Sequence, residues 1–95
     1  MNDIEKSVNL ANAVERLRKN RDFKLVFEET YFKEYPLLLV QMRSSQGAIR
    51  DKDIARYYDS RIVAVGTVQA WLDSVIAEGE AAKEALNNPD NGAEE

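Results

Sequence analysis

Carboxylates are the main side chains in this sequence whose types and spacing could support chemistry. Asp51 and Asp53 are spaced to hold a hard cation or to cap the start of a helix, and no further ligand is spaced to complete a coordination shell. Glu28, Glu29 and Glu34 could join a carboxylate-bridged metal pair, but that motif also needs histidines, and the chain has none. We therefore expect the two aspartates to be capping residues and expect no metal and no cofactor.

The residue types also argue against an enzyme. Without cysteine or histidine, the chain lacks the thiolate nucleophile, the commonest general base and the nucleophile pairs built on them. Its glycines, at positions 47, 66, 79 and 92, form no phosphate-binding loop. We expect a protein that acts by binding.

Length and hydropathy set the scale of the fold. The chain has 95 residues, 44% of them hydrophobic, which suits one domain with a thin helical core and no enclosed pocket. No apolar stretch approaches the roughly 20 residues of a membrane span, and residues 1–20 lack the apolar region of a signal peptide. We expect a cytoplasmic protein without membrane contact.

Charge is divided unevenly along the chain. Residues 1–50 carry nine Lys/Arg and seven Asp/Glu, a net charge of +2, whereas residues 51–95 carry four and ten, a net charge of −6. The acidic half should repel nucleic acid and anionic lipid, and it could meet a basic surface, including the N-terminal half of a second copy. Nucleic acid is therefore not an expected partner.

The elements that position these residues are helices. Residues 51–86 contain no proline, and apolar or small residues recur in them every three or four positions, as one stripe. This pattern predicts a helix roughly 54 Å long with a coiled-coil-like seam. The stripe consists of Ile54, Tyr58, Val65, Val68, Leu72, Val75, Gly79, Ala82 and Leu86. Nothing else in the chain makes a helix of that length, so a second protein or a second copy is expected to cover the excess.

Two shorter helices should precede it. The first is predicted over residues 3–19, capped by Asn2 or Asp3, and the second over residues 22–44, capped by Asp22. Pro36 should kink or break the second helix near Tyr35. Short connections favour an antiparallel three-helix arrangement, so the predicted fold is an all-α domain over residues 1–86 with an acidic, disordered tail over residues 87–95.

Several features of these helices suggest contacts with a partner. Residues 37–40 are apolar on every side of one helical turn, which is normally buried all round and could be covered in part by another subunit. Gly79, and Gly66 with its neighbours Ala64 and Ala70, would admit a close helix. Phe23, Phe27, Tyr31 and Tyr35 lie four apart and should stack along one side, either as core or as a docking stripe.

The interaction residues follow from these patterns. Trp71 is next to the stripe residue Leu72 but is not itself part of the stripe, which suggests that the long helix has a second apolar face. One face could then pack against the chain itself and the other against a second copy. The candidate protein-interaction residues are Val65, Val68, Leu72, Val75, Ile76, Phe27, Tyr31, Tyr35 and Trp71.

Two groups of short strings resemble small uncharacterised helical proteins of tailed bacteriophages. The first is Leu17-Arg18-Lys19-Asn20-Arg21-Asp22-Phe23-Lys24 followed by Tyr31-Phe32-Lys33-Glu34, and the second is Arg61-Ile62-Val63-Ala64-Val65-Gly66, Trp71-Leu72 and Gly79-Glu80-Ala81-Ala82-Lys83. The resemblance covers roughly residues 14–86, is weakest over residues 37–49, and departs from the family at Pro36. It implies a gene in the virion structural module, near portal, scaffold and capsid genes, and it implies no activity and no functional residue.

Two functions are compatible with these observations. The first is a non-enzymatic virion assembly or structural protein (capsid-associated, connector or scaffold-like) that acts through helix–helix self-association, as a homo-oligomer with other phage structural proteins, in the host cytoplasm and the virion. The alternative is a small acidic phage protein that binds and inhibits a host protein. Particle association and a discrete oligomer would favour the first, whereas a monomer bound to one host protein would favour the second.

Overall fold

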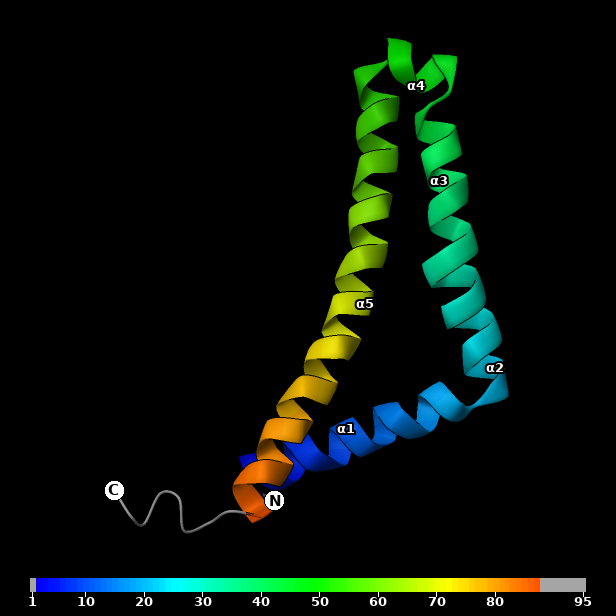
Figure 1. The fold of residues 1–95 in the computed structure, drawn as a ribbon. Helices are drawn as coiled ribbons and strands as arrows, with labels where there is room; N and C mark the ends of the chain where they lie inside the picture. The colour runs from blue at the N-terminus through cyan, green and yellow to red at the C-terminus, as the bar shows by residue number, and fades with distance from the viewer. Residues whose placement is uncertain (1, 88–95) are drawn as a thin grey trace. The chain divides into compact units, whose positions relative to one another are not determined.

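A computed structural model describes residues 2–87, and in that range the chain is almost entirely helical and has no strands (Figure 1). The elements are α1 (Asp3–Lys19), α2 (Arg21–Phe23), η1 (Lys24–Glu34), α3 (Tyr35–Arg43), α4 (Gln46–Arg50) and α5 (Lys52–Asn87). The all-α prediction with one long C-terminal helix is confirmed. The antiparallel order of three helices stays a prediction, and the tail predicted beyond Asn87 lies outside the described residues.

The helix ends are fixed by short polar side chains. The Glu5 backbone N–H donates to Asn2 Oδ1 (2.7 Å), and the Asp53 and Ile54 backbone N–H groups donate to Asp51 Oδ1 (2.8 and 3.4 Å). Asn2 and Asp51 are therefore the N-caps of α1 and α5, because each accepts an N–H that has no partner inside its helix. Each is one of two candidates that the sequence offered, and Asp3 and Asp53 lie instead in the first turns of these helices.

The cap of the second helical segment was predicted wrongly. Asn20, and not Asp22, has extended backbone geometry, and its Oδ1 accepts the Phe23 backbone N–H at 3.0 Å. Helix therefore begins at Arg21, and Asp22 lies in its first turn, where a negative charge suits the helix dipole.

The helix does not break at Pro36. The backbone stays right-handed helical at Glu34 (φ −69°, ψ −42°) and Tyr35 (φ −63°, ψ −47°), and the change near Pro36 is one of helix type. η1 is a π-helix: the Tyr35 N–H donates to the Thr30 carbonyl, five residues back, and Thr30 Oγ1 donates to the Leu25 carbonyl at 2.7 Å. Pro36 then lies in the first turn of α3, the position at which a missing N–H costs least.

The predicted loop after the second helix contains a short helix of its own. Ser45 caps α4 by accepting the Ala48 N–H (3.3 Å), and Ala48 is buried. Figure 1 shows α4 at the turn between α3 and the beginning of α5.

The chain divides into two compact units, each held by its own contacts. The first unit comprises residues 1–19 and 71–95, of which 2–19 and 71–87 are described, and its buried side chains are Ala11, Val14, Leu72 and Val75. The second comprises residues 20–70, and its buried side chains are Leu39, Ala48 and Val65. α5 is one continuous helix that contributes residues to both units.

Candidate protein-interaction surface

The predicted seam of α5 is largely covered by the protein's own chain. Val65, Leu72 and Val75 are buried and Ile76 is half-buried, whereas Val68 is exposed. The sequence left open whether this seam packs within one chain or between chains. Its best-buried residues, Val65, Leu72 and Val75, serve the core, whereas Val68 is exposed and Ile76 is partly accessible.

Gly79 lies at a close approach of two helices in the first unit. A Cβ added at Gly79 would overlap the Cβ of Ala11 and lie 3.3 Å from the Ser7 carbonyl oxygen. The close packing predicted for Gly79 is therefore confirmed, with α1 as the neighbour. Gly66 differs, because a Cβ added there meets nothing within 4 Å.

Ion pairs flank this contact on both sides. Arg18 Nη2 lies 2.8 Å from Asp73 Oδ1, and Lys83 Nζ lies 3.8 Å from Glu15 Oε1. The basic residues Arg16, Arg18 and Lys19 lie in the last turn of α1, where positive charge complements the helix dipole, and Arg18 in addition joins α1 to α5.

The aromatic side chains of the second segment form the predicted row, with Phe23–Phe27 and Tyr31–Tyr35 stacked and Phe27–Tyr31 edge-to-face. Ring centroids lie 5.0 Å apart for Phe23–Phe27, 6.0 Å for Phe27–Tyr31 and 5.8 Å for Tyr31–Tyr35. Phe32 joins this row, 6.1 Å from Phe27 and 5.4 Å from Tyr31, because the π-helix brings residues five apart onto neighbouring positions. Tyr31 and Tyr35 are half-buried and Phe27 is exposed, so the row is partly open to a partner.

The turn of α3 that is apolar on every side is covered on only one. Leu39 is 4% exposed, whereas Leu37, Leu38 and Val40 are 61%, 52% and 51% exposed. No charged residue lies between Tyr35 and Met42 to make this surface water-compatible. These three exposed side chains, Leu37, Leu38 and Val40, are called the α3 patch below.

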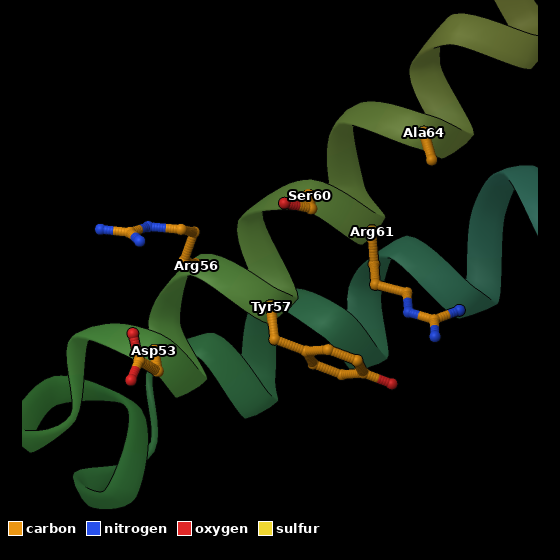
Figure 2. A pocket seen from close by; sticks show the side chains of 6 residues that line it. All are labelled: Asp53, Arg56, Tyr57, Ser60, Arg61 and Ala64. Carbon is orange, nitrogen blue, oxygen red and sulfur yellow. The ribbon is translucent and has the colours of Figure 1, made fainter.

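A second exposed face runs along α5, beside the buried seam. Tyr57 is 53% exposed and Trp71 is 55% exposed. Figure 2 shows a shallow hollow on the first part of this helix, lined by Asp53, Arg56, Tyr57, Ser60, Arg61 and Ala64. The Arg61 guanidinium carbon lies 4.8 Å from the centre of the Tyr57 ring, a cation–π contact. The second apolar face predicted from Trp71 is thus exposed, as a docking face would have to be.

Sequence reasoning missed one further feature of α5. Small uncharged residues at 3/4 spacing are exposed along another side of this helix: Ser60, Val63, Thr67, Ala70, Ser74, Ala77 and Ala81. The hydroxyls of Thr67 and Ser74 donate to the carbonyls of Val63 (2.8 Å) and Trp71 (2.7 Å), so their polar groups are satisfied within the helix. A search for 3/4 spacing that counted small residues along with large apolar ones would have found this row.

Within residues 2–87, no helix is long and apolar enough to cross a membrane, and no group of three or more metal-ligating side chains is assembled. Asp51, one of the two aspartates weighed as cation ligands, is a helix cap. No family model, curated protein or solved structure matches the chain.

Proposed function

We propose that this protein is a non-enzymatic assembly or structural component of a phage virion and that it acts through helix–helix self-association. The α3 patch carries the proposal. A helical turn that is apolar on every side is normally buried all round, and here one residue of four is buried. The remaining three need a neighbour that this chain does not supply.

Covering the α3 patch would stabilise a complex. About half of each patch side chain is still accessible, so covering it would contribute on the order of 1 kcal/mol per residue. Residues 20–70 expose further large apolar side chains, which extends the surface that such a neighbour could cover. These residues are Leu25, Val26, Phe27, Met42, Ile49, Ile54, Tyr57, Val63 and Val68.

The virion role rests on the resemblance of residues 14–86 to small phage proteins and on the need for a neighbour. A particle component present in many copies would supply that neighbour as another copy of itself. The host-binding alternative is supported by the acidic C-terminal half alone.

The test is to quantify the protein in gradient-purified, nuclease-treated particles of the virus that encodes it. We expect many copies per particle for the wild type and few for a Leu37→Ser/Leu38→Ser variant. Leu10→Ser/Leu17→Ser is the matched control, because these two exposed leucines of α1 lie outside the proposed interface. Absence of the wild type from particles, together with a stable complex with one host protein, would replace the proposal by the alternative.

A further inference from the structure

We infer that the hollow on α5 binds the acidic C-terminal segment, residues 71–95, of a second copy of the chain. This inference rests on the proposed self-association and names the contact that orients it. The hollow and the acidic segment are different surfaces, so the contact is head-to-tail, and a discrete oligomer requires that it close into a ring.

The shape of the hollow suits a helix or an extended segment laid across it. Figure 2 shows Tyr57 and Arg61 projecting together on one side, with Arg56 projecting on the other. Ser60 and Ala64 have short side chains, so they leave the floor between these longer groups low. A segment placed there would have a guanidinium on either side of it and the exposed Tyr57 ring as an apolar contact.

Both guanidinium groups lack an anionic partner in the described part of the chain. The carboxylates three positions away from Arg56 are Asp53 and Asp59: Asp53 lines the hollow but forms no ion pair with Arg56, and Asp59 is held by Arg43 at 2.8 Å. The helical neighbours three and four positions beyond Arg61 are Ala64 and Val65, which are uncharged. Among residues 2–87, Arg56 and Arg61 therefore form no ion pair.

The charge of the chain identifies the occupant. Residues 1–70 carry a net charge of +2 and residues 71–95 a net charge of −6. Asp73 is already paired with Arg18, but Glu78 forms no ion pair within the described range, and the sequence adds Asp90, Glu94 and Glu95 beyond it. A carboxylate from a second copy would form charge-assisted hydrogen bonds with the free guanidinium groups.

A nucleic-acid backbone is the less suitable polyanion for this hollow. Asp53 lines it alongside the two arginines, and the whole chain carries a net charge of −4. Both features oppose a dense row of phosphates. A protein segment offers separate carboxylates with small apolar residues between them, here Ala77, Ala81 and Ala82.

The test compares self-association of the full-length wild type with that of Arg56→Glu/Arg61→Glu, by light scattering at low and high salt. We expect the variant to self-associate at least about ten-fold more weakly at low salt, because a repelling charge at an interface opposes binding. Lys24→Glu/Arg50→Glu is the control, with the same change in charge at two exposed cations outside the hollow. Circular dichroism must show equal helicity for the wild type and all variants. If Arg56→Glu/Arg61→Glu unfolds, Arg56→Gln/Arg61→Gln is used in its place.

A complementary variant makes the test specific. Glu78→Lys/Asp90→Lys/Glu94→Lys should also self-associate weakly, and mixing it with Arg56→Glu/Arg61→Glu should restore association. An unchanged oligomer in the Arg56→Glu/Arg61→Glu variant would overturn the inference and leave the proposed self-association standing. An equal loss of self-association in the Lys24→Glu/Arg50→Glu control would also overturn the inference. So would competition by duplex DNA for the self-association contact, if mixing the two charge-reversed variants does not restore association. A wild type that is monomeric at every concentration would overturn both proposals.

Discussion

The two compact units of this chain differ in how completely they bury their own apolar residues. In the first unit, α1 and the last part of α5 meet through small side chains, with Ala11 against Gly79, and two ion pairs join the same helices. In the second unit, Leu39, Ala48 and Val65 are buried while most of the large apolar side chains stay exposed. The first unit leaves fewer large apolar side chains exposed (Ile4, Leu10, Leu17, Trp71 and Leu86), whereas the second exposes a larger set that includes the three residues of the α3 patch.

Residue size explains much of this difference. Small residues let two helix backbones approach closely, so that a short contact excludes water without large side chains. The second unit instead has a π-helix rich in aromatic rings and a turn of four aliphatic residues, more apolar surface than one neighbouring helix segment can cover. The comparison predicts that substitutions at buried positions of the first unit change stability, whereas substitutions at exposed positions of the second change association.

The largest effect is expected from Leu72→Asp. This substitution places a carboxylate at a buried position of the first unit, and we expect it to lower the free energy of unfolding by about 4 kcal/mol or more. Trp71→Asp is the matched change at the adjacent exposed position and should leave the helix content nearly unaltered. Thermal denaturation followed by circular dichroism measures both, and equal losses would show that the burial assigned to Leu72 is wrong.

The glycine pair should give the next largest effect. Gly79→Ala drives a Cβ into Ala11, so we expect destabilisation of about 1–3 kcal/mol despite the better helix propensity of alanine. Gly66→Ala meets nothing within 4 Å and should stabilise the helix by about 1 kcal/mol. Chemical denaturation of the two variants gives the sign of each change. If Gly79→Ala instead stabilises the protein, the close contact between α1 and α5 at Gly79 is wrong.

A smaller effect is expected from Tyr31→Ala. Tyr31 lies 6.0 Å from Phe27, 5.4 Å from Phe32 and 5.8 Å from Tyr35, so its removal interrupts the aromatic row. We expect a loss of about 1 kcal/mol per aromatic contact at most, a weaker near-ultraviolet circular dichroism signal and weaker association. Unaltered association by a folded variant would assign the row to the core alone.

The ion pairs should contribute least. Arg18 and Asp73 in the first unit, and Arg43 and Asp59 in the second, lie 2.8 Å apart with partly exposed side chains. Solvent and salt screen such pairs, so Arg18→Ala and Arg43→Ala should each cost less than about 1 kcal/mol, and the cost should shrink in high salt. Denaturation midpoints at two salt concentrations test this, and a large salt-independent loss would point to packing by the arginine stems.

The sequence predicted the helices well where local signals act alone. The 3/4 spacing of α5 and the caps Asn2 and Asp51 depend on residues close together in the chain, and the structure shows the same elements. Asn20 and Asp22 are both good caps, and the choice between them depends on which residue adopts extended geometry, which propensity alone does not decide.

Features that depend on distant residues or on helix type were predicted less well. The π-helix before Pro36 changes the spacing from four to five, and this brings Phe32 into the aromatic row. Apolar spacing alone also does not tell which of two faces the chain covers itself, so Val65, Leu72 and Val75 entered the candidate set as partner residues although they are buried. The α3 patch is different, because the sequence already predicted that these four consecutive apolar residues could be covered in part by another subunit, and three of them are exposed.

The most direct test of the central claim is the solution mass of the purified wild type, measured by light scattering during size-exclusion chromatography over a concentration series. The account predicts a discrete oligomer that is lost in Leu37→Ser/Leu38→Ser while helicity is retained. A wild type that stays monomeric at every concentration would contradict self-association through the second unit.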